Sequence, residues 1–201
     1  MGSFFITRPA PVARFEGGKT LAPIPVRSRA VFDTLILATL DPTVDALAPA
    51  DPVVVRVGGQ VLAHQPDVHL IAGGRVTVVD VPNPSRVAME GPRYAAVAAA
   101  YAERGVAYER RRPPQVHGSP LLMNARAVWA CRGATVSAPD QVRVLEALAG
   151  GPRPLAEAAR AVPSGDGVVV CLALACRDLL EIDLTGAPLG PETPVKRRRH
   201  P

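Results

Sequence analysis

Two aspartates that flank short β-branched runs are the residues of this sequence best placed to do chemistry. Asp67 stands directly before one such run and Asp80 ends the next, with the Gly73-Gly74 pair between the runs. A glycine pair between β-branched runs predicts an antiparallel hairpin, which brings the two carboxylates together. Carboxylate oxygens hold Mg²⁺, and the ion polarises a phosphoryl group and activates water. The pattern therefore indicates a candidate site for phosphodiester cleavage.

The spacing of these acids resembles the PD-(D/E)xK element of metal-dependent nucleases. In that element the second acid and a lysine two positions later share one face of a strand and point at the scissile phosphate. Pro66-Asp67 supplies the first part, and Asp80 takes the acidic position. The lysine position is Pro82, which has no cation and cannot donate a ladder hydrogen bond. We expect Asp67 and Asp80 to be the catalytic and metal-binding candidates, with Mg²⁺ as cofactor if the site is active and none if it is degenerate.

Other residues with reactive side chains give weaker patterns. His64 precedes the Pro-Asp pair, and we interpret it as a structural or solvent-facing residue and not as a ligand. Three cysteines form no C-x-x-C pair, and their odd number argues against a disulfide framework. No glycine pair has the G-x-x-x-x-G-K-[ST] spacing, so we expect no nucleotide site.

Arginine supplies nearly all of the positive charge. The formal net charge is +5, and Lys19 and Lys196 are the only lysines. Arginine clusters suit phosphate backbones because one guanidinium can donate two hydrogen bonds to a pair of oxygens. A GC-rich genome would also give an arginine-rich composition. A solvated, disordered basic tail is an equal alternative at the end of the chain. The candidate DNA-binding residues are Arg86, Arg110, Arg111, Arg112, Lys196, Arg197, Arg198 and Arg199.

The apolar segments are too short to cross a bilayer, which needs roughly 18–20 consecutive apolar residues. The first residues also lack the continuous apolar region of a signal peptide. The sequence therefore predicts a soluble, cytoplasmic protein without a membrane partner.

The N-terminal two thirds of the chain alternate between helical and β-branched patterns. Residues 1–27 are proline-rich and predict an extended arm, and a serine cap begins a helix that ends at Asp41-Pro42. Glycine pairs separate the strands that follow. A strand, a helix and a strand then predict a crossover. The expected ranges are a helix over 28–40, strands over 52–57, 60–72 and 75–81, a helix over 92–104, a strand over 106–111 and a helix over 119–131.

The C-terminal third has a different pattern. Three short helices, over 139–149, 154–162 and 167–178, precede a strand, a Gly/Pro-rich turn and a last strand. This order is typical of a winged helix-turn-helix module, and a plain helical cap on the first domain is the alternative.

The ordered set of short motifs resembles the TnsA-like transposon endonucleases. That resemblance implies a restriction-endonuclease-like domain over 28–132 and a small winged-helix domain after it. It also implies a Mg²⁺-dependent endonuclease that nicks donor DNA at a transposon end beside a transposase partner. The matching segments are Leu40-Asp41-Pro42-Thr43-Val44, His64-Gln65-Pro66-Asp67-Val68, Gly73-Gly74-Arg75, Val78-Val79-Asp80-Val81, Tyr101-Ala102-Glu103-Arg104-Gly105, Pro120-Leu121 and Asn124-Ala125.

The sequence departs from that family at the catalytic positions. The glutamate that the family places on the first helix falls near Val31, and its lysine falls on Pro82. We therefore expect an α/β protein whose mixed sheet is flanked by helices and whose function is to bind DNA and protein partners as a scaffolding subunit, without cleaving DNA. Alternatives are an active Mg²⁺ nuclease, with Arg86 replacing the lysine, and a protein-interaction subunit without DNA contact. The expected organisation is an arm over 1–27, domains over 28–132 and 133–195, and a basic tail over 196–201.

Overall fold

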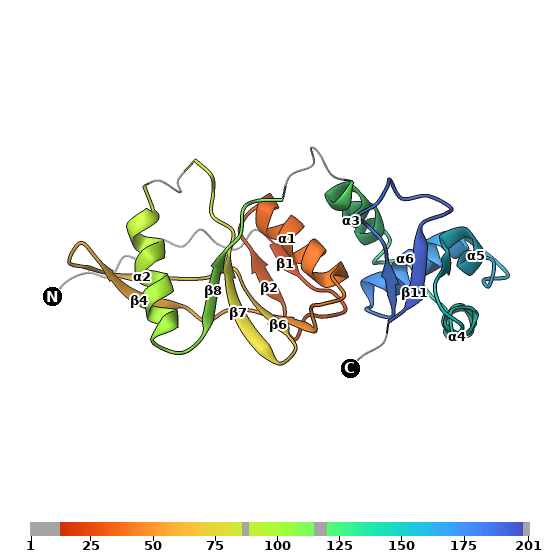
Figure 1. Cartoon of the computed structure of the whole chain (residues 1–201), viewed down its shortest axis with the longest axis horizontal. Helices are drawn as coiled ribbons and strands as arrows, with labels where there is room; N and C mark the ends of the chain where they lie inside the picture. The colour runs from red at the N-terminus through yellow and green to blue at the C-terminus, as the bar shows by residue number, and fades with distance from the viewer. Residues whose placement is uncertain (1–12, 86–88, 115–119, 199–201) are drawn as a thin grey trace. The chain divides into compact units, whose positions relative to one another are not determined.

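The computed structural model describes residues 13–85, 89–114 and 120–198 (Figure 1). These residues form two compact units. The first unit contains residues 13–16, 20–34 and 44–113, and the second contains the remaining described residues. The helix expected over 119–131 therefore groups with the second unit, whereas the sequence analysis assigns it to the first domain.

A mixed four-stranded sheet forms the centre of the first unit. Its strands are ordered β3 (Ala46–Ala48), β6 (Val68–Ala72), β7 (Arg75–Asp80) and β8 (Ala107–Arg110). The pairs β3–β6 and β6–β7 are antiparallel, and β7–β8 is parallel. The parallel pair is joined through helix α2 (Gly91–Ala102), so the predicted strand–helix–strand crossover is confirmed.

Two glycine turns shape this unit. Strands β4 (Val53–Val57) and β5 (Gln60–His64) form an antiparallel hairpin around Gly58-Gly59, and β6 and β7 form one around Gly73-Gly74. All four glycines have positive φ, between 54° and 82°, which explains why the turns need glycine. Both predicted hairpins are confirmed. The inward side chains of β4 pack with α2 and β7 in a core cluster of Val53, Val55, Val78, Val97 and Tyr101.

Helix α1 (Arg29–Leu40) begins and ends where the sequence predicts. The hydroxyl of Ser28 accepts a hydrogen bond from Val31 N at 3.2 Å, which caps the helix. Before it, β1 (Ala13–Phe15) and β2 (Ile24–Val26) form a two-stranded antiparallel sheet. Phe15 and Ile24 are buried, so the described part of the expected arm is a packed hairpin.

The second unit places helices around one apolar helix. Helix α6 (Gly167–Cys176) is buried from Val170 to Cys176 and packs against the other helices and β10. Strands β9, β10 and β11 form an antiparallel sheet in the order β10-β11-β9. The predicted order of three helices and two later strands is confirmed. The other elements are α3 (Leu121–Ala130), α4 (Ala138–Ala147), β9 (Arg153–Pro154), α5 (Leu155–Ala159), β10 (Leu180–Ile182) and β11 (Pro194–Arg197).

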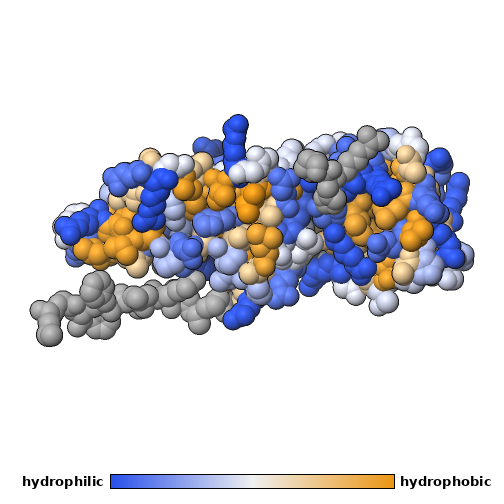
Figure 2. Space-filling view, turned by 90° about the horizontal axis from the view of Figure 1, so that it is seen from below, coloured by the Kyte–Doolittle hydropathy of each residue, from blue (hydrophilic) through white to orange (hydrophobic). Residues whose placement is uncertain are grey.

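Apolar side chains also reach the surface. Figure 2 shows orange apolar patches between hydrophilic side chains on one face of the chain. The most exposed large apolar side chains of the described residues are Met89, at 78%, and Leu21, at 68%. Within the described ranges, none of the helices combines the length and the apolar character that a membrane span requires.

Gly167 is a position where the packing of the second unit admits no side chain. A Cβ atom there would lie 2.8 Å from the carbonyl carbon of Ala159 and would also clash with its oxygen. We expect Gly167→Ala to lower the free energy of unfolding by about 1–3 kcal/mol, because backbone atoms of α5 have no room to move. Gly150→Ala is the matched control, since its Cβ would meet nothing within 4 Å. Urea denaturation of both variants measures the difference, and equal stabilities would contradict this account of the contact.

Candidate functional site

The pairing of β6 with β7 brings the two predicted acids together. Val68 lies opposite Val79, so Asp67, just before β6, lies beside Asp80 at the end of β7. Asp67 N donates to Val79 O at 3.0 Å, and Val81 N donates to Asp67 Oδ2 at 2.8 Å. Their exposed fractions are only 3% for Asp67 and 1% for Asp80. The hairpin thus creates a buried pair of carboxylates.

The side chain of Arg27 joins both carboxylates. Its Nε and Nη2 atoms donate to Asp67 Oδ1 at 2.9 Å and 2.5 Å. Nη2 also lies 3.6 Å from Asp80 Oδ1, which makes a second ion pair. Arg27 follows β2 and precedes the Ser28 cap of α1, so backbone structure holds it on both sides. A cation from the N-terminal hairpin region therefore lies between the two acids.

The second oxygen of Asp80 is held by two other side chains. His64 Nε2 lies 2.6 Å from Asp80 Oδ2, and Tyr108 donates its hydroxyl to the same oxygen at 2.7 Å. His64 is 2% exposed, and its Nδ1 atom is buried with no hydrogen-bond partner in the described part of the chain. The ring of Tyr94 meets the His64 ring edge-on, with the centroids 5.8 Å apart. The last residue of β5 and a residue of β8 thus complete the site.

Burial sets the protonation tendencies at this site. It raises the pKa of Asp67, against the opposing effects of the Arg27 charge and the Val81 N–H. Burial also raises the pKa of Tyr108, and the charge of Asp80 raises it further. The pKa of Tyr94 is raised for the same reasons, burial first and then the carboxylate of Glu90. The tyrosine hydroxyls therefore remain protonated donors at neutral pH.

With Arg27 in place, the arrangement does not fit the Mg²⁺ ion that the resemblance implies. The carboxylates of Asp67 and Asp80 accept from protein donors, and among the described residues no three His, Cys, Asp or Glu side chains are grouped to hold a metal. Pro82 offers no amine, and Val31 is 2% exposed within α1. The side chains that contact the two carboxylates are the guanidinium of Arg27, the imidazole of His64 and the phenol of Tyr108. None of these groups activates a water molecule as a bound metal does.

The first basic cluster begins at the edge of this site. Arg110 is in register with Asp80, and Arg111 N donates to Asp80 O at 2.8 Å. The guanidinium of Arg110 lies 5.6 Å from the centre of the Tyr94 ring, and Arg111 pairs with Glu109 at 3.1 Å. Arg110 and Arg112 are exposed and Arg111 is half-buried. Three arginines thus leave the end of β8 beside the buried acids, while Arg86 lies outside the described residues.

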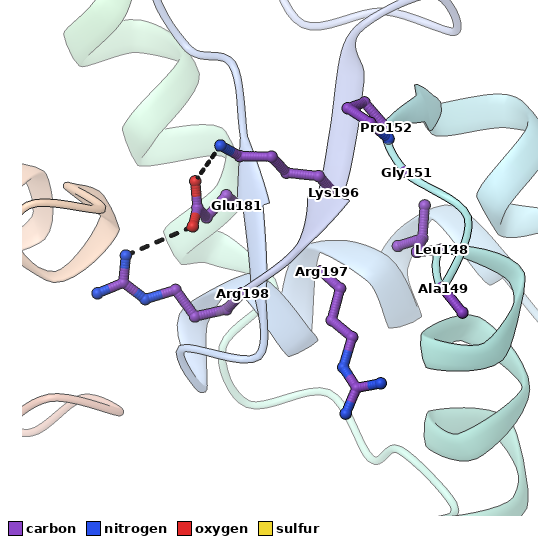
Figure 3. Close-up of a pocket in the computed structure, with 8 residues that line it drawn as sticks. All are labelled: Leu148, Ala149, Gly151, Pro152, Glu181, Lys196, Arg197 and Arg198. Atoms are coloured by element: carbon purple, nitrogen blue, oxygen red, sulfur yellow. Dashed lines mark hydrogen bonds and ion pairs between the residues drawn. The ribbon is translucent and has the colours of Figure 1, made fainter. Parts of the chain in front are cut away.

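The second basic cluster is divided between the surface and the interior. Lys196 pairs with Glu181 at 2.8 Å, and the two lie side by side in Figure 3. Arg198 is buried, pairs with Glu181 at 3.5 Å and with Asp178 at 3.4 Å, and donates to Pro42 O. Arg197 points away from these acids along a hollow of about 730 Å³. Arg199 lies outside the described residues, so Lys196 and Arg197 are the described members of this cluster whose side chains reach solvent.

A buried lysine completes the ionic network around Arg198. Lys19, 4% exposed, pairs with Asp178 at 3.2 Å and donates to Asp41 O at 2.6 Å. Burial lowers the pKa of Lys19, and the carboxylate of Asp178 opposes that shift. Arg198 and Lys19 therefore both stabilise the second unit by neutralising the same acid.

Sequence reasoning did not find three members of the candidate site. It interpreted His64 as structural or solvent-facing, and it gave no role to Arg27 or Tyr108. A histidine three positions before the Pro-Asp aspartate was a usable signal, because the connection between β5 and β6 spans only residues 65–67. Arg27 and Tyr108 lie in separate elements, and no local pattern links them to the acids.

No protein-family model matches the chain, and a search of curated proteins finds no match either.

Neighbouring arginines of the second cluster have opposite expected roles. We expect Arg198→Ala to lower the free energy of unfolding by about 2–3 kcal/mol, because it removes the charge-assisted bonds of a buried arginine to two half-buried acids. Arg197→Ala should change it by less than about 0.5 kcal/mol, since that side chain is exposed. Urea denaturation of the two variants gives the comparison. A costly Arg197→Ala together with a neutral Arg198→Ala would reverse the assignment.

Proposed function

We propose that this chain is a DNA-associated subunit of a DNA-processing assembly, with a nuclease-like site that does not cleave. The observation that carries the proposal is the closed Asp67–Asp80 pair beside the Arg110–Arg112 cluster. The acids are those that a metal-dependent nuclease would use, but Arg27 and other protein groups saturate them. The adjacent arginines retain the charge that attracts a phosphate backbone.

The topology of the first unit supports a restriction-endonuclease-like domain similar to the TnsA-like endonucleases. The element order is the first half of α1, up to residue 34, then β3, β6, β7, α2 and β8, with the β4–β5 hairpin inserted before β6. The two acids lie where the start of β6 meets the end of β7. Catalytic side chains do not determine a fold, so a protein can keep this architecture after losing the lysine and the helix-one glutamate.

The second unit supports a winged-helix-like module whose third helix does not read DNA. Strand β9 lies between α4 and α5 in the chain and pairs with β11, an arrangement typical of winged helices. Helix α6 takes the place of the recognition helix, yet it is apolar and buried. A helix that enters the major groove needs exposed polar side chains. We therefore assign DNA contact to the cluster at 110–112 and protein contact to the second unit.

A protein-interaction subunit without DNA contact is the second candidate. It is favoured by the burial of α6 and by the connection over 183–193, which contains Asp183 and Glu192 but no lysine or arginine. A basic wing would be expected if this connection contacted phosphates. An active Mg²⁺ nuclease is the third candidate, and it requires the arginine bridge to open.

Salt-dependent binding separates the first two candidates. We expect weak, sequence-independent binding to a duplex of about 20 base pairs, with the logarithm of the affinity falling steeply between about 50 and 200 mM salt. Substituting Arg110, Arg111 and Arg112 by glutamine should reduce that slope by up to about 3, because up to three phosphate contacts are lost at about 0.9 each. Fluorescence anisotropy measures the slope. The matched control substitutes Arg143, Arg153 and Arg160 by glutamine, an equal change of charge in the second unit. Equal slopes for both variants, or no binding at low salt, would favour the protein-interaction subunit.

Plasmid nicking tests the absence of cleavage. We expect the purified chain to leave supercoiled plasmid intact in Mg²⁺ and in Mn²⁺. Losing one group that stabilises the transition state costs on the order of 10²–10³ in rate, and this site lacks both the lysine and a free pair of carboxylates. Gel electrophoresis of the plasmid gives the readout. Cleavage by the unmodified chain that Asp67→Ala abolishes would establish the active nuclease instead.

A further inference from the structure

We infer that the Asp67–Asp80 pair is a cation site whose permanent occupant is the guanidinium of Arg27. This inference rests on the proposed nuclease-like site and specifies which ion that site accepts. The chain supplies its own cation where a nuclease of this architecture would recruit a divalent metal. The chemical class that fits the position is therefore a guanidinium or, once Arg27 is removed, a divalent cation.

The two oxygens of each carboxylate have different partners, and this difference supports the inference. Each acid has its Oδ2 atom held by groups other than Arg27: Val81 N for Asp67, and His64 and Tyr108 for Asp80. The Oδ1 atoms of both acids remain, and both contact Arg27. Metal sites use the same arrangement, in which outer hydrogen bonds orient the ligand oxygens toward one central cation. The oxygens are thus preorganised around a positive charge.

The position between the Oδ1 atoms of Asp67 and Asp80 needs a positive charge. Both carboxylates are nearly inaccessible to water, so an unpaired negative charge there would be costly. Arginine meets the requirement at every physiological pH because its guanidinium does not lose its proton. A tethered cation also outcompetes a free ion, since it loses no translational freedom on binding. Metal binding by the unmodified chain would have to displace this group.

The position of Arg27 in the chain makes its side chain replaceable. The backbone on either side is held by β2 and by the Ser28 cap, so truncating the side chain removes no hydrogen bond of these two elements. The Arg27 side chain is 30% exposed, whereas those of Asp67 and Asp80 are at most 2% exposed. The site therefore opens to solvent on the side from which Arg27 enters, and a small cation can follow that path.

Chemical rescue of Arg27→Ala in the full chain tests the inference. We expect the variant to melt roughly 10 °C below the unmodified chain, because a buried ion pair loses its cation. Millimolar ethylguanidinium or Mn²⁺ should each raise its Tm by about 5 °C and leave the unmodified chain unchanged. Electron paramagnetic resonance should show one more bound Mn²⁺ in the variant than in the unmodified chain. Arg75→Ala is the matched control, since Arg75 is an exposed arginine of the same unit and should show neither response.

A second variant keeps the test decisive if Arg27→Ala does not fold alone. The double variant Arg27→Ala with Asp67→Asn has one fewer buried charge, so it should fold without added cation and bind no extra Mn²⁺. Folding of Arg27→Ala only when ethylguanidinium or Mn²⁺ is present would support the inference. Failure of both cations to stabilise it, or equal Mn²⁺ binding by the single and double variants, would overturn it. None of these readouts uses DNA, so they remain valid if the proposed function is wrong.

Discussion

The antiparallel pairing of β6 with β7 is the constraint on which the first unit depends. It places Asp67 beside Asp80 in a region with almost no access to water, and two adjacent buried carboxylates cannot both remain charged without compensation. Three neighbouring elements supply the side chains that compensate this negative charge. The segment after β2 supplies Arg27, β5 supplies His64 and β8 supplies Tyr108. The two acids therefore join β5, β8 and the segment after β2 through side-chain contacts.

The way in which the charge is compensated decides what this site can do chemically. A divalent ion would leave coordination positions for water and substrate, and it would lower the pKa of a bound water. A guanidinium fills its position with N–H groups and offers neither property. In the function proposed above, the identity of the cation at this pair of acids distinguishes a non-cleaving protein from a cleaving one. In this chain the cation is part of the protein.

In the second unit, consecutive basic residues differ in whether their side chains reach solvent. Lys196, Arg197 and Arg198 are consecutive, yet Lys196 and Arg197 are exposed and Arg198 is buried. Arg198 joins Lys19 in neutralising Asp178, while Arg197 remains exposed. Helix α6, the last helix of the unit, likewise has the composition of a core element. Burial of Arg198 and of α6 makes both part of the interior of the unit.

The sequence by itself determined the elements whose causes are local. The Ser28 cap, the positive-φ glycine pairs and the β-branched runs gave α1 and both hairpins, because each depends on residues a few positions apart. The sequence also predicted that Asp67 and Asp80 would meet, since one hairpin joins them. Only the tertiary structure decided that Arg27 lies on Asp67, 40 positions away, and Tyr108 on Asp80, 28 positions away. Such contacts follow from how separate elements pack around buried charge, and no periodicity along the chain encodes that choice.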